Sequence, residues 1–134
     1  MKKLDNYRRA LASLEKIYEY EEPYGQIELA GIVALFETSF ELAWKAMKET
    51  LAYYGYPEEQ TGSPRTVLKT AFKVGMIDDE ALWLEVLVAR NNVSHSYNAE
   101  VALEIARKTK ESYYPMLRRV LDAIECDWPL GDRD

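Results

Sequence analysis

Apolar side chains recur at helical spacing along nearly the whole chain, and this pattern constrains the fold more than any other feature of the sequence. No segment shows the sustained alternation of apolar and polar residues that marks a half-buried strand. Each helix then has to bury one apolar stripe against its neighbours. We therefore predict an all-α protein, folded as an antiparallel up-and-down four-helix bundle with one short extra helix as a crossover.

The ends of five helices are marked by local signals. Pro23 follows the first helix, Gly55 stops the second, Ser63 and Pro64 open the short third one, and Asn98 is the predicted N-cap of the last. The expected helices cover about residues 3–20, 24–54, 64–75, 78 onward, and 98–126. The side chains expected to face the core are Leu4, Tyr7, Leu11, Leu14 and Tyr18 in the first helix, Leu29, Ile32, Val33, Phe36, Phe40, Trp44, Met47, Leu51 and Tyr54 in the second, and Leu103, Ala106, Tyr113, Leu117, Val120, Leu121 and Ile124 in the last.

Residues 81–89 are apolar at every position except Glu85, so this run fits either a buried strand or a helix that is buried on most sides. We predict a helix, because acidic residues 78–80 suit the positive end of the helix dipole and few β-branched residues are present. Burial on two sides also favours a partner chain.

Pro115 lies inside the last predicted helix, where a proline removes one backbone donor and bends the helix. We expect the bend near Tyr113. Residues 1–126 are predicted to form a single helical domain. Residues 127–134 are predicted to be a frayed tail, with Trp128 able to pack back on the bundle.

Charge and cysteine content exclude several classes of function. The 134-residue chain carries a formal net charge of −6, which opposes general binding to nucleic acid or anionic membrane, so any RNA contact must be local and we expect neither DNA nor a membrane as partner. Cys126 is the single cysteine, which excludes an intramolecular disulfide and a Cys-rich zinc site. No secretory signal or membrane-length apolar run is seen, so we expect a soluble cytoplasmic protein.

The strongest candidate for chemistry is the polar segment around His95, the only histidine. A single histidine without His-x3-His or Glu-x2-His spacing does not indicate a metal site, and we expect no cofactor. On a helix, Arg90, Ser94 and Tyr97 would align, with Asn91 and His95 on the adjacent stripe. These groups are costly to bury unless they serve a pocket or interface. The alternative is that they cap helix ends.

Arg90, the polar Asn91 after it, His95 and Tyr97 match an Arg-x4-His-x-Tyr pattern. This pattern resembles the signature of the HEPN superfamily, specifically the small HEPN proteins paired with minimal nucleotidyltransferases. The resemblance covers about residues 4–124. It implies a helical bundle that pairs as a symmetric homodimer, with two copies of the motif in one cleft. It also implies metal-independent RNA cleavage by the toxin of a toxin–antitoxin pair, although such proteins are also described as substrate-binding subunits of a nucleotidyltransferase.

The resemblance assigns catalytic roles that make chemical sense. His95 would move a proton on the attacking 2′-hydroxyl or the leaving 5′-oxygen. Arg90 would bind the scissile phosphate, and Asn91 would orient the phosphate or His95. Because each chain has one histidine, acid and base roles at one phosphate would need both subunits. Tyr97 resembles the tyrosine to which a cognate nucleotidyltransferase adds AMP; the alternative is that Tyr97 only packs near the helix end.

The predicted third helix carries a basic stripe. Arg65, Lys69 and Lys73 recur every four positions, and no acidic residue occurs between Gly62 and Ile77. Such a stripe would follow an RNA backbone or bind a nucleotide triphosphate, whereas the alternative is an ordinary solvated helix face. If it binds RNA, Lys69→Glu weakens that binding; unchanged binding and salt dependence would discard the idea.

The first functional hypothesis is therefore a HEPN toxin ribonuclease, neutralised by a cognate minimal nucleotidyltransferase. The second is a non-catalytic substrate-binding subunit of a two-component nucleotidyltransferase, in which Arg90 and His95 hold phosphate without cleaving it. The third keeps only the dimeric bundle, with the polar segment as caps and interface contacts. The sequence lacks the Gly-Ser and paired-Asp elements of a nucleotidyltransferase, so a second protein would have to transfer the nucleotide.

Overall fold

The structure is a computed structural model that describes residues 2–58, 61–95 and 98–129, with only the backbone of Lys2, Ser94 and His95. Its helices are α1 (Lys2–Leu14), the 3-10 segment η1 (Glu15–Glu19), α2 (Gln26–Tyr53), α3 (Pro64–Lys73), α4 (Glu80–His95), α5 (Ala99–Lys108), the π segment η3 (Thr109–Tyr113) and α6 (Tyr114–Asp127). No strand occurs in the part of the chain described, which confirms the all-helical prediction there.

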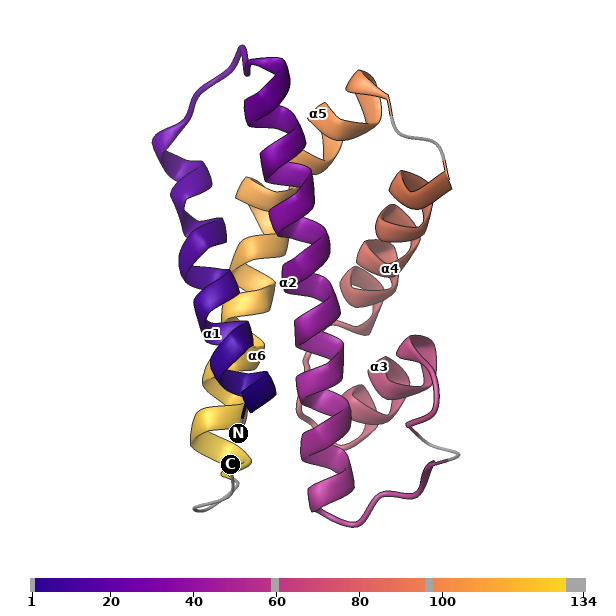
Figure 1. Cartoon of the computed structure of the whole chain (residues 1–134). Coiled ribbons are helices and arrows are strands. Elements are labelled where there is room, and N and C mark those ends of the chain that lie inside the picture. Colours follow the sequence, from indigo (N-terminus) through magenta and orange to yellow (C-terminus); the bar gives the residue numbers. More distant parts are fainter. Residues whose placement is uncertain (1, 59–60, 96–97, 130–134) are drawn as a thin grey trace.

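The helices form a bundle around α2, the longest of them (Figure 1). Helices α1 and α6 lie on one side of α2, and α3 and α4 lie on the other. The long helices that follow one another in the chain run in opposite directions, and α3 lies at the end of the bundle where the chain passes from α2 to α4. The single chain does not test the predicted dimer, which stays a prediction.

Helix α4 is fixed to the bundle by a row of buried apolar side chains. Trp83 is 1% exposed, and its ring centre lies 6.2 Å from that of Phe40 in α2. Val86 and Val93 are also buried, one and three turns further along. Complete burial of side chains of this size contributes about 1.5–3 kcal/mol each, so the inner face of α4 has little freedom to rotate. The choice of helix for residues 81–89 is confirmed.

The predicted helix ends are also present. The hydroxyl of Ser63 accepts a hydrogen bond from the backbone N–H three residues later (3.2 Å), and the Asn98 side chain does the same at the start of α5 (2.9 Å). Each bond satisfies a donor that has no partner inside the helix. Gly55 and Gly75 end α2 and α3 with φ of +93° and +84°, a conformation that other residues rarely adopt.

The last predicted helix is interrupted where the sequence places a proline. Instead of one bent α-helix, the chain forms α5, a wider π turn at η3, and then α6. The π turn ends at Tyr113, two residues before Pro115. A wider turn relieves the clash between the proline ring and the preceding turn. The position of the interruption was predicted correctly, and its form is a π segment.

Some predicted core positions are wrong. Tyr18 is 44% exposed and Ile17 is buried instead, because η1 is a 3-10 segment and turns a different residue inward. Tyr54 is 41% exposed, beyond the end of α2. Leu103 is only half-buried, and the inner face of α5 is formed by its neighbours, Ile105 among them.

The first residues of the predicted tail pack on the bundle. The ring centre of Trp128 lies 5.1 Å from that of Tyr54, edge to face, and the Tyr54 hydroxyl donates a hydrogen bond to the carbonyl of Pro129. Residues 130–134 lie outside the described residues. The division into a domain of residues 1–126 and a tail stays a prediction. Among the described helices, none combines the length and apolar character needed to cross a membrane.

Candidate functional site

The first half of the predicted motif lies near the end of α4, where Arg90 continues the stripe of Trp83 and Val86 and faces α2. Arg90 and Asn91 follow the buried stretch of α4, and Val93 anchors the same part of the helix with 6% exposure. The side chains of Arg90 and Asn91 therefore extend from a part of α4 that is held in place by buried contacts. This gives the Arg90 guanidinium a fixed base from which to reach a neighbouring helix.

Glu41 and Asn91 are among the groups that hold the Arg90 guanidinium. Its Nη2 donates to Oε2 of Glu41 in α2 at 2.6 Å, and its Nη1 donates to the Asn91 side-chain oxygen at 3.0 Å. The Arg90 and Glu41 side chains are 27% and 32% exposed, so the pair is partly shielded from water. Charge-assisted hydrogen bonds of this kind fix the plane of a guanidinium. Asn91 therefore orients Arg90 in this structure.

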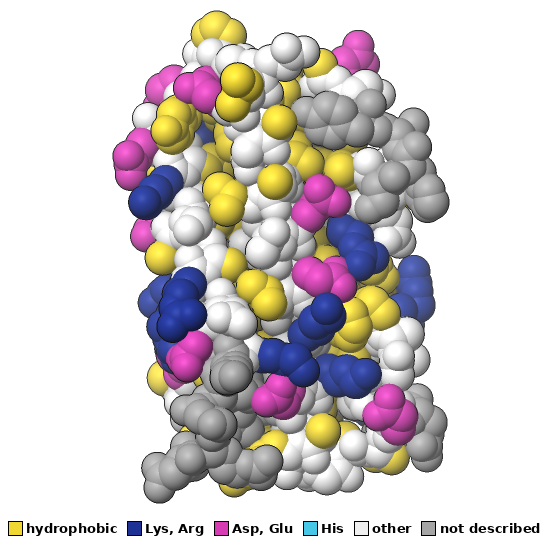
Figure 2. Space-filling model, in the orientation of Figure 1, with side chains coloured by type: hydrophobic (Ala, Val, Ile, Leu, Met, Phe, Trp, Pro, Cys, Tyr) yellow, Lys and Arg dark blue, Asp and Glu magenta, His cyan; other side chains and the backbone are white. Residues whose placement is uncertain are grey.

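A second cation faces the same carboxylate. Lys45 lies one helical turn after Glu41 in α2, and its Nζ is 3.8 Å from Glu41 Oε1. Each oxygen of Glu41 thus faces one cation, Arg90 on one side and Lys45 on the other. Figure 2 shows basic and acidic side chains next to one another over α2 and the helices beside it. In this cluster the cations outnumber the carboxylate.

Sequence reasoning missed Glu41 and Lys45. Their four-residue spacing is the ordinary spacing of a helical ion pair, which is common on solvated faces. Arg90 is 49 positions away from Glu41, and only the packing of α4 on α2 brings the two together. An ion pair between residues so far apart cannot be recognised from a single sequence.

The rest of the motif is described only in part. The backbone of His95 lies in the last turn of α4, whereas its side chain and all of Tyr97 lie outside the described residues. The alternative interpretation, capping of helix ends, applies to Asn98, which caps α5. Arg90 donates hydrogen bonds to Asn91 and to Glu41, so the hydrogen bonds described for the side chains of Arg90 and Asn91 are not helix caps.

The predicted basic stripe lies on the exposed face of α3. Arg65, Lys69 and Lys73 are all exposed. Lys69 Nζ lies 3.6 Å from a carboxylate oxygen of Glu80, the first residue of α4. This ion pair offsets part of the stripe's positive charge.

One cavity, of about 480 Å³, lies between α4 and α5. Its lining includes the carboxylates of Glu85, Glu100 and Glu104 and the cation Lys108, 3.7 Å from Glu85. The Tyr113 hydroxyl donates to Glu85 at 2.7 Å, and burial, followed by this hydrogen bond, raises the pKa of Tyr113. The excess of carboxylates makes this cavity unfavourable for a phosphate.

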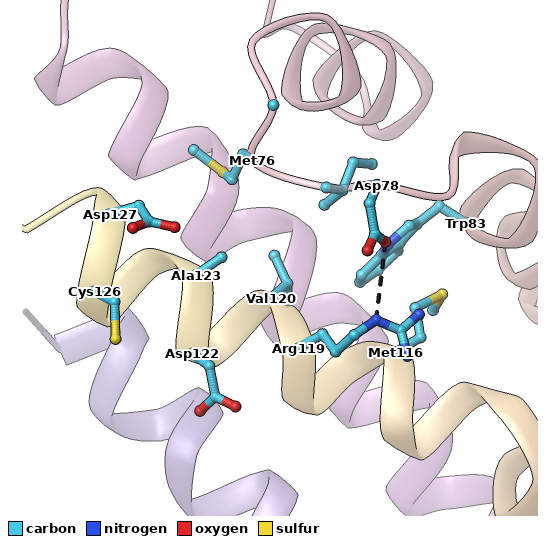
Figure 3. Close-up of a pocket in the computed structure, with 12 residues that line it drawn as sticks. Met76, Asp78, Trp83, Met116, Arg119, Val120, Asp122, Ala123, Cys126 and Asp127 are labelled. Carbon is cyan, nitrogen blue, oxygen red and sulfur yellow. Dashed lines mark ion pairs between the residues drawn. The ribbon is translucent and has the colours of Figure 1, made fainter.

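A second cavity, of about 380 Å³, lies between α6 and the segment that joins α3 to α4 (Figure 3). Asp78 and Arg119 point toward one another across it, with 3.8 Å between their charged atoms. Asp122 and Asp127 also line it, so carboxylates again exceed cations. Among the described residues, no group of three or more His, Cys, Asp or Glu side chains is placed to hold a metal ion.

Comparison with known proteins assigns the family. Residues 2–126 match the model of the family described as nucleotidyltransferase substrate binding protein like. The chain belongs to this family. With the Arg-x4-His-x-Tyr pattern, this identifies it as a small HEPN-type protein, as predicted.

Known proteins that are similar to this chain include a curated relative and a solved structure. A Haemophilus influenzae protein named probable ribonuclease HepT is 30% identical over 79 residues, which is 58% of this chain and 54% of that protein. The match thus spans about half the length of that relative. A crystal structure of a Thermus thermophilus protein superimposes with a TM-score of 0.71 and 29% identity, covering 87% of this chain and 96% of the other. The same helical fold therefore occurs in a solved structure.

Proposed function

We propose that this HEPN-type protein is a metal-independent endoribonuclease, the toxin of a toxin–antitoxin pair. The observation that carries the proposal is the position of Arg90, which lies on the same helix as His95. Hydrogen bonds to Glu41 of α2 and to Asn91 hold its guanidinium in place. It lies in a cluster where cations exceed carboxylates, on a chain with a net charge of −6. Similarity to a protein named probable ribonuclease HepT supports the proposal.

The proposed reaction uses the 2′-hydroxyl of RNA as nucleophile. His95 accepts the 2′-hydroxyl proton while the oxygen attacks the adjacent phosphorus, and the bond from phosphorus to the 5′-oxygen breaks. The 5′-oxygen leaves with a proton donated by a second imidazole. The products are a 2′,3′-cyclic phosphate and a 5′-hydroxyl. Arg90 stabilises the charge that develops on the phosphate oxygens, with Asn91 orienting Arg90.

The second imidazole comes from the partner in a symmetric homodimer, because each chain has one histidine. The outer face of α4 supports pairing along this helix, since Val88 is 49% exposed and Leu84, one turn before it, is only half-buried. Such side chains lose contact with water when two copies pair.

The proposed antitoxin is a cognate minimal nucleotidyltransferase, which transfers AMP from ATP to the Tyr97 hydroxyl and releases pyrophosphate. The family description supports an association with a nucleotidyltransferase. A phosphate attached two residues after His95 would compete for Arg90 and repel RNA. We propose the cytoplasm as the compartment in which toxin, antitoxin and RNA meet.

The test is RNA cleavage by the purified protein in excess EDTA, with Arg90→Ala and His95→Ala variants that retain the helical circular dichroism spectrum. The proposal expects cleavage by the wild type and its loss in both variants. No cleavage over a broad panel of RNAs, or equal cleavage by all three proteins, contradicts it.

The second candidate function is a non-catalytic substrate-binding subunit of a two-component nucleotidyltransferase. The family description favours it, because it names substrate binding for a nucleotidyltransferase. In this case Arg90 holds a nucleotide or acceptor phosphate that the partner's active site uses. Binding of ATP or RNA that depends on Arg90, without cleavage, would replace the first candidate with the second.

The basic stripe of α3 is proposed as an auxiliary RNA contact. Because Lys69 is paired with Glu80, Arg65 and Lys73 are the cations expected to contribute more. Lys73→Glu should weaken RNA binding and reduce its salt dependence. Lys69→Glu should weaken it too, while also placing two carboxylates together.

A further inference from the structure

Glu41 lies between two cations, and its carboxylate stands where a phosphate would be in a phosphate-binding site. Arg90 Nη2 lies 2.6 Å from one oxygen of Glu41, and Lys45 Nζ lies 3.8 Å from the other. The two cations come from different helices, α4 and α2, and converge on one anion. A carboxylate and a phosphate present similar pairs of oxygens, and the same cationic side chains bind both.

We propose that Lys45 and Arg90 together bind one phosphate group of the ligand, and that Glu41 weakens this binding by holding both cations in the resting protein. The inference deepens the proposed function and rests on Arg90 being a phosphate-binding residue. The phosphate comes either from RNA or from a nucleotide, since the two candidate functions share this chemistry.

The exposure of the three side chains fits this role. Arg90, Glu41 and Lys45 are 27%, 32% and 44% exposed, so a ligand can reach them while water screens them only in part. Lys45 Nζ also lies 6.0 Å from the centre of the Trp44 ring, a distance at which a cation is attracted to the ring face. Lys45 is therefore directed by two neighbours.

Charge arithmetic fixes the direction of each effect. With Glu41 ionised, Arg90 and Lys45 leave one positive charge for the incoming phosphate. Glu41→Gln keeps a side-chain oxygen that accepts from Arg90 and removes the negative charge, so the phosphate meets two cations. Lys45→Gln leaves Arg90 and Glu41 paired with no positive charge in excess. The first variant should bind phosphate more tightly and the second more weakly.

The chain offers two matched controls in the same helix. Lys48 lies one turn after Lys45 but pairs with Glu58 at 3.7 Å, and Glu49 pairs with Lys3 at 3.3 Å. Lys48→Gln and Glu49→Gln change the net charge by the same amounts as the two test variants. Any difference between test and control therefore comes from position and not from overall charge.

The measurement is the dissociation constant of a short single-stranded RNA with 2′-O-methyl groups on every sugar, which blocks the nucleophile, at four NaCl concentrations in EDTA. The same series with ATP distinguishes the two sources of phosphate. We expect Lys45→Gln to weaken binding about three- to tenfold at low salt and Glu41→Gln to tighten it by a similar factor, while the controls change it less than twofold. In a plot of the logarithm of the dissociation constant against the logarithm of the salt concentration, the slope should be smaller in magnitude by about 0.7 in Lys45→Gln than in the wild type.

The inference is overturned if Lys45→Gln and Glu41→Gln behave like their controls, if Glu41→Gln weakens binding, or if the wild type binds neither probe. Its failure is separable from that of the proposed function. If cleavage depends on Arg90 but the Lys45→Gln and Glu41→Gln variants bind RNA and ATP as their controls do, only the inference is contradicted. Position-specific binding effects in a protein that does not cleave RNA keep the inference and remove the ribonuclease.

Discussion

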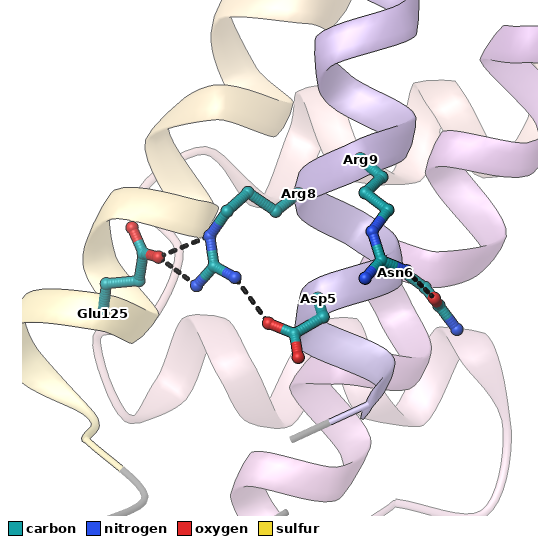
Figure 4. A network of polar contacts seen from close by, with 5 residues as sticks. All are labelled: Asp5, Asn6, Arg8, Arg9 and Glu125. Carbon is teal, nitrogen blue, oxygen red and sulfur yellow. Dashed lines mark hydrogen bonds and ion pairs between the residues drawn. The ribbon is translucent and has the colours of Figure 1, made fainter.

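Arg8 and Arg90 each connect two helices of this bundle, and their surroundings carry opposite charge. Arg8 of α1 donates from Nε to Glu125 of α6 at 3.0 Å and from Nη1 to Asp5 at 2.6 Å (Figure 4). Its Nη2 also donates to Glu125. The neighbouring Arg9 bonds to Asn6 at 3.3 Å on the other side of α1 and does not join these carboxylates. One cation therefore faces two carboxylates at Arg8, whereas two cations face one carboxylate at Arg90.

The difference separates a structural ion pair from a candidate binding site. The pKa of the Arg8 guanidinium is raised, chiefly by the hydrogen bond with Glu125, and its donors are directed at the two carboxylates. An approaching phosphate would meet a net negative charge there. At Arg90 it would meet a net positive charge. The same side chain thus connects helices in one place and is suited to bind an anion in the other.

The largest expected effect is on cleavage. Arg90→Ala should lower the single-turnover rate of RNA cleavage by about a hundredfold or more, since it removes a charged donor from the transition state. Arg8→Ala should leave the rate within about twofold. Equal losses in the two variants would show that both arginines act only through the fold.

A second prediction concerns the buried contact beside Arg8. Tyr7 is 0% exposed and donates its hydroxyl to the carbonyl of Leu117 in α6, and burial is the main cause that raises its pKa well above the usual value. Tyr7→Phe should lower the free energy of unfolding by about 1 kcal/mol at pH 7.

The pH dependence of this difference follows from the direction of the pKa change. Because the folded protein holds the Tyr7 proton more tightly than the unfolded chain, the stabilisation is complete below about pH 10 and is lost as pH rises further. The wild type should therefore lose its advantage over Tyr7→Phe by about pH 11. Urea unfolding at pH 7, 10 and 11 measures this, and a gap that widens with pH would contradict the assignment.

The smallest expected effect is on stability at the two arginines. The Arg8 side chain is 44% exposed and Arg90 is 27% exposed, so each alanine variant should cost about 1 kcal/mol or less of unfolding free energy. Added salt should reduce both costs. A loss of several kcal/mol in Arg90→Ala would mean that its effect on cleavage reflects unfolding.

The sequence predicted the features that depend on local chemistry. Helix ends at Ser63, Gly55 and Asn98 are set by residues within one turn, and they occur where expected. The exposure of Tyr18 was mispredicted because the change from α to 3-10 geometry after Leu14 carries no signal in the apolar spacing.

The candidate site was predictable only where a family pattern marks it. Arg90 and Asn91 belong to that pattern, and their roles stay predictions, as do those of His95 and Tyr97. Glu41 and Lys45 belong to no pattern, and their meeting with Arg90 depends on the angle at which α4 packs on α2 through Trp83 and Phe40. Such a contact between distant segments has to be seen in three dimensions.

The central claim is tested most directly by cleavage of one RNA oligonucleotide in excess EDTA, with and without a single 2′-deoxy sugar at the cleaved position. The account predicts a 2′,3′-cyclic phosphate product from the all-RNA strand and no cleavage at the deoxy position, because the nucleophile is missing. Cleavage at the deoxy position, or none of either strand, would contradict it.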